Sequence, residues 1–347
     1  VATGLKDTIH NLEIIKITAC AQGSCIFNGL MLDAGKSVVT GIIPETRKIH
    51  FIGNSITCGY GIEVLNNVLH YDPATENSND AYATLTARSL NSDFNIVARS
   101  GIGIYRNYGD PSAGSSDNMY AIYNRIFHNR SNPLWNFSKF QPDVLCINLG
   151  TNDFSENKGD ATLFTTQYDK FIDTLRLKYP NANIVLLMGP MLNTSAFKNI
   201  LQNLVTKHTN AGDSKISILE LSAQGSLGYG ADWHPSKAQA RKNAAELITY
   251  IKKLKGWSSF PIPQTVNTTN GGSSIDIEFN DSISTGLRLK GFEIYADSIK
   301  IPTDSIVLIN GAGKKIRIYL KTRIKQAQKV EVKYLNGNIR NIEGMPV

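Results

Sequence analysis

The stretch FIGNSITCGYG, residues 51–61, ends a short apolar run at a glycine and then presents Ser55 at the start of a turn of small residues. Ser55 has two interpretations here. It is either a nucleophile held on a sharp strand-to-helix turn or the polar residue that begins a helix, because serine is among the best N-cap residues. Taken alone, these eleven residues favour neither interpretation, so the surrounding sequence has to decide.

The regions around this stretch alternate regularly between two kinds of segment. Short apolar runs lie at 49–53, 94–99, 142–148, 183–188 and 216–221. Longer segments between them, such as ATLFTTQYDKFIDTLRLKYP (161–180), have apolar residues at helical spacing. Strands that alternate with helices form a parallel sheet covered on both faces. Residues 46–257 are therefore predicted to form a doubly wound α/β domain with five parallel strands.

Both ends of the chain have a different pattern. Residues 264–347 alternate with period two, as in SIDIEF (274–279) and KIRIYL (315–320), which predicts a small β-sandwich. In residues 1–45, LEIIKITA (12–19) and CIFNGLMLD (25–33) are strand candidates. So few strands do not close a sandwich, so we expect them either to pack on another domain or to belong to one that is cut short in this chain.

Composition excludes some classes of protein. The net charge of +7 comes from 36 basic and 29 acidic residues, and the basic residues are spread along the chain, whereas nucleic-acid binding needs them clustered. We therefore expect no nucleic-acid partner. No apolar stretch approaches the roughly 20 residues that span a bilayer. The opening VATGLKDTIH lacks the pattern of a secretory signal, so we expect a cytoplasmic protein or one whose leader has been removed.

Four short motifs converge on one edge of the predicted sheet. Ser55 follows the first strand, SGIGI (100–104) the second and GTND (150–153) the third. ADWHPS (231–236) lies between the last strand and the final helix. All four therefore lie at the carboxyl ends of parallel strands, which is where open α/β sheets bind ligands.

Together these motifs supply the parts that acyl transfer needs. Ser55 is the candidate nucleophile, His234 its base, and Asp232, two residues earlier in an expected extended turn, the partner that orients the imidazole. The backbone N–H groups of Ser55 and Gly101 and the Asn152 amide are candidate oxyanion donors. This chemistry requires no metal or organic cofactor.

Each motif also has an ordinary interpretation. DWHP could begin a helix, and GTND could be a turn that ends a strand. SGIGI suggests a dinucleotide-binding loop, but Arg106 stands where that motif has its third glycine. If these ordinary interpretations were all correct, four independent turns would present Ser, Gly, Asn and His at one sheet edge by accident. The four motifs taken together therefore favour the catalytic interpretation.

The ordered set resembles the SGNH hydrolase superfamily over residues 46–257. The resemblance implies a flavodoxin-like sheet, Ser55 as nucleophile, Gly101 and Asn152 as oxyanion donors, His234 as base and Asp232 as its partner. In finer detail, RKIHFIGNSITCGYG (47–61), SGIGIYRNYGD (100–110) and ADWHPS resemble carbohydrate esterase family 2. That family implies aromatic residues around the sugar cleft, here Trp233 and Tyr108.

The same resemblance covers the flanking segments and has departures. IKIT (15–18) and FNGLMLDAG (27–35) resemble the end of the family's N-terminal jelly roll, whose early strands are missing here, and the C-terminal sandwich resembles immunoglobulin-like appendages. Asn54 replaces the acid of the usual G-D-S block. Some family members orient the histidine with a backbone carbonyl, which is the alternative to the Asp232 carboxylate in that role.

The resemblance implies a secreted or periplasmic serine esterase that removes O-acetyl groups from plant cell-wall polysaccharides such as xylan or glucomannan. Its partner would be an acetylated polysaccharide or oligosaccharide. One alternative is a lipase or thioesterase that acts on longer acyl esters. A second alternative is a non-catalytic glycan-binding surface protein that uses the C-terminal sandwich.

Overall fold

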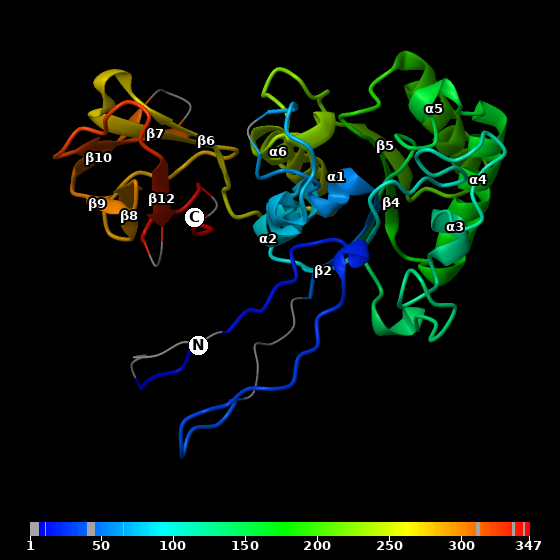
Figure 1. Ribbon diagram of the computed structural model, residues 1–347, viewed down its shortest axis with the longest axis horizontal. Coiled ribbons are helices and arrows are strands. Elements are labelled where there is room, and N and C mark those ends of the chain that lie inside the picture. The colour runs from blue at the N-terminus through cyan, green and yellow to red at the C-terminus, as the bar shows by residue number, and fades with distance from the viewer. Residues whose placement is uncertain are drawn as a thin grey trace.

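The computed structural model describes residues 7–10, 12–39, 46–64, 66–309, 313–334, 337–342 and 344–347. A five-stranded parallel sheet forms the centre of its α/β body (Figure 1). Its strands are β1 (Lys48–Gly53), β2 (Asp93–Ala98), β3 (Val144–Asn148), β4 (Asn183–Met188) and β5 (Ile216–Glu220). Their order is β2-β1-β3-β4-β5, and every neighbouring pair is parallel. This confirms the predicted doubly wound, flavodoxin-like sheet and places β1 between β2 and β3, at the switch point where such sheets bind ligands.

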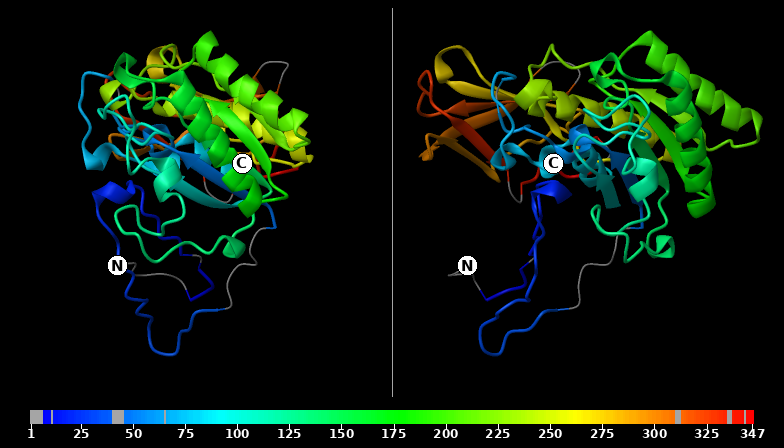
Figure 2. Two further views of the ribbon diagram at one scale, coloured as in Figure 1. Left: turned by 90° about the vertical axis from the view of Figure 1, so that its right-hand side faces the viewer. Right: turned by 45° about the vertical axis from the view of Figure 1, so that its right-hand side comes forward.

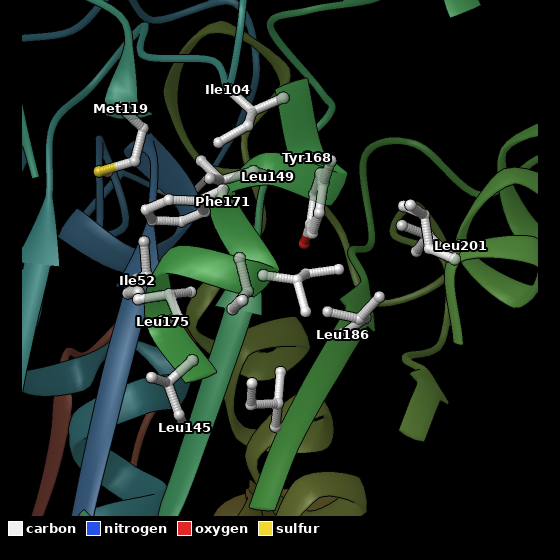
Figure 3. Packing of buried hydrophobic residues seen from close by; sticks show 14 of the residues in the cluster. Ile52, Ile104, Met119, Leu145, Leu149, Tyr168, Phe171, Leu175, Leu186 and Leu201 are labelled. Carbon is white, nitrogen blue, oxygen red and sulfur yellow. The ribbon is translucent and has the colours of Figure 1, made fainter. Parts of the chain in front are cut away.

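Helices cover both faces of the sheet. Helices α2 (Tyr82–Ser89) and α6 (Lys237–Lys255) pack on the face that contains Phe51 and Cys146. Helices α3 (Met119–Ile122), α4 (Ala161–Lys178) and α5 (Ser195–Asn210) pack on the other. Figure 3 shows Ile52, Leu145 and Leu186 of the strands against Phe171 and Leu175 of α4. Because both faces are buried, the strands have continuous apolar sequences rather than alternating ones.

Short helical turns occupy several of the connections. Helix α1 (Ser55–Cys58) directly follows β1. The 3₁₀ turns are η1 (Cys20–Gln22), η2 (Pro73–Thr75), η3 (Ser78–Asp80), η4 (Phe137–Lys139), η5 (Ser155–Asn157), η6 (Ala231–Trp233) and η7 (Asn270–Gly272). Two of them, η5 and η6, lie in the loops that follow β3 and β5, so they shape the edge of the sheet that carries the predicted motifs.

Two antiparallel sheets make up the C-terminal region. Strands β6 (Pro263–Thr268), β7 (Ser274–Phe279), β10 (Thr303–Ile309) and β11 (Lys315–Leu320) have the order β10-β11-β7-β6, and β8 (Phe292–Ala296), β9 (Ile299–Ile301) and β12 (Val330–Tyr334) have the order β12-β8-β9. Buried side chains of both sheets, among them Ile277 and Ile294, form one cluster. The predicted small β-sandwich is therefore confirmed, and it lies beside α6 (Figure 1). The domain boundaries at 45/46 and 257/264 stay a prediction.

The strands predicted near the N-terminus are absent. Residues 7–10 and 12–39 contain η1 but no β-strand, so the prediction for 12–19 and 25–33 is wrong, and the rest of the predicted 1–45 segment lies outside the described residues. Figure 2 shows residues 12–39 as an extended loop outside the α/β body. Apolar side chains such as Ile26 and Phe27 are exposed on it. A strand needs a neighbouring strand for its backbone N–H and C=O groups. The described part of this segment has none: the Ile17 carbonyl accepts from the Ser78 N–H, but this single bond does not form a strand ladder.

No helix among the described residues is both long enough and apolar enough to cross a membrane.

Candidate active site

Ser55 begins α1 at the point where β1 ends. Asn54 is the N-cap of this helix, and its side-chain oxygen accepts a hydrogen bond from the Ile56 N–H at 3.1 Å. A Cβ atom on Gly53 would lie 2.0 Å from the Thr57 Oγ1, so the turn requires a glycine there. Ser55 is therefore the first residue of the helix, as one interpretation expected, but the cap is the amide of Asn54, which leaves the Ser55 hydroxyl available.

His234 lies next to Ser55 and is oriented by backbone carbonyls. Its Nε2 is 2.8 Å from the Ser55 Oγ, and its Nδ1 is 3.2 Å from both the Ala231 and the Asp232 carbonyl oxygens. A carbonyl oxygen only accepts, so Nδ1 carries the proton and Nε2 accepts from the Ser55 hydroxyl. Burial lowers the pKa of His234 below its usual 6.5, although the carbonyls oppose this shift. The imidazole is therefore a neutral base at neutral pH.

The predicted contact between the Asp232 carboxylate and the imidazole is not formed. That carboxylate accepts instead from the Tyr60 hydroxyl at 3.0 Å, the Tyr71 N–H at 2.9 Å and the His70 Nδ1 at 2.8 Å. The turn is left-handed rather than extended, with φ of +47° at Asp232 and +64° at Trp233. Such a turn directs the carboxylate away from His234 and presents the backbone carbonyl to it. Each of these conformations costs about 1 kcal/mol or more for a residue with a side chain.

The candidate oxyanion donors lie in the loops that follow the two neighbours of β1. Gly101 follows β2 and adopts a φ of +80°, which favours glycine. Asn152 follows β3 and is 7% exposed, and its Nδ2 donates one hydrogen bond to the Ile102 carbonyl at 2.8 Å. An amide group has two N–H bonds, so a second donor is available for an oxyanion. The topology thus places these donors in the loops on either side of Ser55.

Two buried charged residues that the sequence interpretation missed join these loops. The Asp153 carboxylate accepts hydrogen bonds from the N–H groups of Ile104, Tyr105 and Arg106 at 2.9–3.1 Å. Burial raises the pKa of Asp153 to about 6, against the effect of these donors. The Arg106 guanidinium in turn donates to the carbonyls of Asn152 and Asp153 and pairs with Glu156. Both residues stood inside quoted motifs, but no sequence pattern indicates that a charge will be buried against backbone.

Two exposed aromatic side chains adjoin site residues, and a third packs on the histidine itself. Trp233 is 58% exposed and packs edge-to-face on Tyr229 with ring centroids 5.1 Å apart. Tyr108 is 63% exposed, and its N–H donates to the Gly101 carbonyl at 2.8 Å. The Tyr60 ring, which was not predicted, stacks on the His234 imidazole at 4.1 Å. The two predicted aromatic residues therefore lie at the surface beside site residues, whereas Tyr60 is part of the site itself.

A small cavity lies beside Ser55. Its volume is about 10 Å³, and Ile56, Tyr60, Tyr82 and Pro235 contribute to its walls. This is roughly the space for one water molecule. Within the described part of the chain, no cluster of three or more His, Cys, Asp or Glu side chains could hold a metal ion. The groups brought together are thus a hydroxyl, a neutral imidazole and N–H donors, which is a set suited to acyl transfer.

Comparison with known proteins agrees with this geometry. Residues 51–238 match the GDSL-like Lipase/Acylhydrolase family. The chain belongs to this family. The chain is 39% identical to the cellulase/esterase CelE of Acetivibrio thermocellus over 259 aligned residues. This alignment covers 74% of the chain but only 31% of CelE. The chain is also 27% identical to an acetylxylan esterase/glucomannan deacetylase of Cellvibrio japonicus, over 72% of this chain and 68% of that protein.

Solved structures show the same relationship for the GDSL-like domain. A family two carbohydrate esterase from Clostridium thermocellum, solved in complex with cellohexaose, superposes with a TM-score of 0.61 and 39% identity, over 64% of this chain and 68% of the other. A carbohydrate esterase family 2 enzyme from Corynascus thermopiles superposes with a TM-score of 0.58 and 29% identity, over 63% of this chain and 69% of the other. The resemblance to SGNH hydrolases and to carbohydrate esterase family 2 is therefore confirmed.

Proposed function

We propose that this protein is a serine esterase that removes O-acetyl groups from plant cell-wall polysaccharides such as xylan or glucomannan. The observation that carries the proposal is the 2.8 Å contact between the Ser55 Oγ and the Nε2 of a neutral, partly buried His234. The relatives described as acetylxylan esterase/glucomannan deacetylase support the choice of substrate. Because such polysaccharides are met outside the cell, we also propose that the enzyme is secreted or periplasmic.

The mechanism follows from the hydrogen bonds at His234. Nε2 takes the proton of the Ser55 hydroxyl while Oγ attacks the acetyl carbonyl carbon. The carbonyls of Ala231 and Asp232 accept from Nδ1 and stabilise the positive charge on the imidazolium. The N–H of Ser55, the N–H of Gly101 and the Asn152 amide bind the oxyanion. His234 then protonates the departing sugar oxygen, and a water activated by the same imidazole releases acetate from Ser55.

The relatives favour the acetylesterase over the lipase or thioesterase alternative. Two of them are described as acetylxylan esterase/glucomannan deacetylase, so the acyl group in their names is a short acetyl group. The cavity beside Ser55 does not bear on this choice, because neither Gly101 nor Asn152 is among the residues that line it.

Acetate release tests the proposal directly. Acetylated xylan and acetylated glucomannan are incubated with the protein, and ¹H NMR follows free acetate and the loss of each acetyl signal. We expect release from at least one polymer, and hydrolysis of p-nitrophenyl acetate faster than that of the octanoate by about tenfold or more. A preference for octanoate with no acetate release would contradict the proposal and favour the lipase alternative.

A second candidate function is the binding of unsubstituted glycan without catalysis. The relative solved in complex with cellohexaose supports it, as do Trp233 and Tyr108, whose exposed rings suit the apolar faces of pyranoses. Calorimetric titration of cellohexaose into Ser55→Ala and Trp233→Ala variants tests this candidate. Binding that survives in Ser55→Ala and is lost in Trp233→Ala would place it at the esterase cleft. Binding by residues 264–347 alone would place it in the sandwich.

A further inference from the structure

Two tyrosine rings are stacked behind the imidazole of the catalytic histidine. The Tyr60 ring lies against the His234 imidazole with centroids 4.1 Å apart and planes at 29°, and the Tyr71 ring lies on the other side of Tyr60 at 4.1 Å and 19°. Tyr60 also contributes to the wall of the cavity beside Ser55. An imidazole held only by Nδ1 can still tilt about those hydrogen bonds, whereas a ring packed on its face fixes its plane. The stack therefore controls where Nε2 points.

The Asp232 carboxylate holds this stack in place. One of its oxygens, Oδ2, accepts from both the Tyr60 hydroxyl and the Tyr71 N–H, while Oδ1 accepts from the exposed His70. The Asp232 N–H donates to the Leu69 carbonyl at 3.3 Å, so the same residue fastens the loop before Tyr71. Burial by itself would raise the pKa of the Asp232 carboxyl. The hydrogen bonds donated by His70, Tyr71 and Tyr60 outweigh this effect and hold the pKa below its usual range. The carboxylate is therefore ionised and saturated with donors at neutral pH.

The other end of the stack is fixed separately. The Tyr71 hydroxyl donates to the Glu76 Oε2 at 2.9 Å, and the Ala19 N–H donates to the same oxygen at 2.8 Å. Glu76 is 1% exposed. Because Tyr71 is held from both sides, Tyr60 has a rigid surface behind it, and displacement of the Tyr60 hydroxyl is transmitted to the face of His234.

We propose that Asp232 and Tyr60 are positioning residues of the reaction: the carboxylate holds the Tyr60 hydroxyl, and the Tyr60 ring fixes the plane of His234 so that Nε2 faces Ser55. Asp232 thus acts on the histidine twice, through its backbone carbonyl at Nδ1 and through the Tyr60 ring. This role differs from that of the acid in a Ser-His-Asp triad, because the carboxylate does not touch the imidazole. The inference rests on the proposed esterase function for its rate measurements.

Two substitutions of Asp232 separate these roles. Asp232→Gly removes the carboxylate but allows the left-handed conformation, so we expect kcat to fall about ten- to a hundredfold with little change in KM. Asp232→Asn has the same shape, and asparagine tolerates the left-handed region. Its Oδ1 can accept from Tyr60 and Tyr71 while its Nδ2 donates to His70. We therefore expect Asp232→Asn to regain most of that loss, whereas a triad acid replaced by asparagine would cost about 10⁴ in kcat.

A double-mutant cycle tests the route through Tyr60. Tyr60→Phe keeps the ring and removes only the hydroxyl, so its effect on kcat is expected to disappear in the Asp232→Gly background. Asp72→Gly is the matched control and should leave kcat unchanged, because Asp72 is exposed and its carboxylate accepts from the Ala74 N–H rather than from Tyr60 or Tyr71. Additive effects of Tyr60→Phe and Asp232→Gly, or an unchanged kcat in Asp232→Gly, would overturn the proposal.

The rate of Ser55 labelling by a fluorophosphonate keeps this test independent of the substrate. Labelling requires that the His234 Nε2 faces the Ser55 hydroxyl, but it does not require an acetylated sugar. We expect Asp232→Gly to slow it in proportion to its loss of kcat, and Asp232→Asn to restore it. If the wild-type protein is labelled but releases no acetate, the proposed function fails while the inference is still tested by labelling. If labelling is equal in all variants, the inference fails.

Discussion

Arg106 and Asp153 hold each other's backbone rather than each other's side chain. The carboxylate of Asp153 accepts from three consecutive N–H groups that include that of Arg106, and the guanidinium of Arg106 donates to the carbonyl of Asp153. Both residues are fully buried. This reciprocal pair locks the loop that carries Gly101 to the loop that carries Asn152, so the two proposed oxyanion donors are fixed relative to one another before substrate arrives.

The first prediction concerns this pair. Arg106→Met should lower the free energy of unfolding by about 3–5 kcal/mol, because it removes the buried guanidinium that donates to the carbonyls of Asn152, Asp153 and Ser155. It should also lower kcat, since the two loops are no longer joined. Lys198→Met is the matched control, because Lys198 forms an exposed pair with Glu220 and should cost about 1 kcal/mol or less. Urea denaturation and kcat of both variants provide the check, and equal destabilisation of the two would contradict the role of the pair.

The second prediction concerns the oxyanion. Asn152→Ala should reduce kcat by about 10²–10³ with a smaller effect on KM, because the lost donor acts on charge that develops in the transition state. Steady-state kinetics on p-nitrophenyl acetate measure the effect. Asn136→Ala removes the side-chain cap of η4 at the surface and should leave kcat as it is. A change confined to KM would show that Asn152 binds substrate and oxyanion equally.

The third prediction concerns the pH dependence of the reaction. His234 must be neutral to accept the Ser55 proton, and burial holds its pKa below 6.5. A lowered pKa keeps the base form present to more acidic pH, so kcat/KM should rise with pH and reach half its plateau below pH 6.5. An NMR titration of the His234 Cε1–H, assigned by its absence in His234→Ala, should give the same midpoint. A midpoint above 6.5 by both methods would contradict the neutral buried base.

The fourth prediction concerns stability and involves a histidine outside the site. His50 is 1% exposed, its Nε2 lies 2.9 Å from the Tyr123 hydroxyl, and burial lowers its pKa to about 4. Between pH 6.5 and 4 the unfolded chain takes up this proton and the folded chain does not, so stability from the neutral ring is present above pH 6.5 and is lost as the pH falls. By pH 4 the loss amounts to about 3 kcal/mol.

A comparison with His50→Gln isolates this contribution, because other titrating groups such as Asp153 are common to both proteins. The wild-type protein should be more stable than the variant at pH 7, and this advantage should narrow by about 3 kcal/mol on going to pH 4. Denaturation curves at several pH values measure it. A difference that stays constant from pH 7 to 4 would mean that His50 does not titrate in the way its burial requires.

The sequence was sufficient for the parts of the site that the fold positions. Ser55, Gly101 and Asn152 follow three strands of a parallel sheet, and the carboxyl ends of such strands meet at one edge whatever the side chains do. His234 was found by the same argument, since it lies between β5 and α6. The alternation of apolar runs and amphipathic segments likewise predicted the strand count and the two covered faces correctly.

The features of the fold and the site that the sequence did not predict depend on backbone conformations and on partners that are distant in the sequence. The direction of the Asp232 carboxylate follows from left-handed backbone at Asp232 and Trp233, which nothing in ADWHPS requires. The N-terminal runs have strand propensity, but a strand also needs a neighbouring strand, and 12–19 and 25–33 have no neighbouring strand among the described residues. The buried charge of Arg106 is stabilised by carbonyls of a loop some 50 positions away in the sequence.

The central claim is that Ser55, activated by His234, removes acetyl groups from a polysaccharide, and acetate release by the Ser55→Ala variant tests it most directly. Wild-type protein and variant are compared at equal concentration on the same acetylated polymer, with circular dichroism to verify that both are folded. We predict that the variant releases acetate at least about a thousandfold more slowly. Release at a near-normal rate by folded Ser55→Ala would contradict the account.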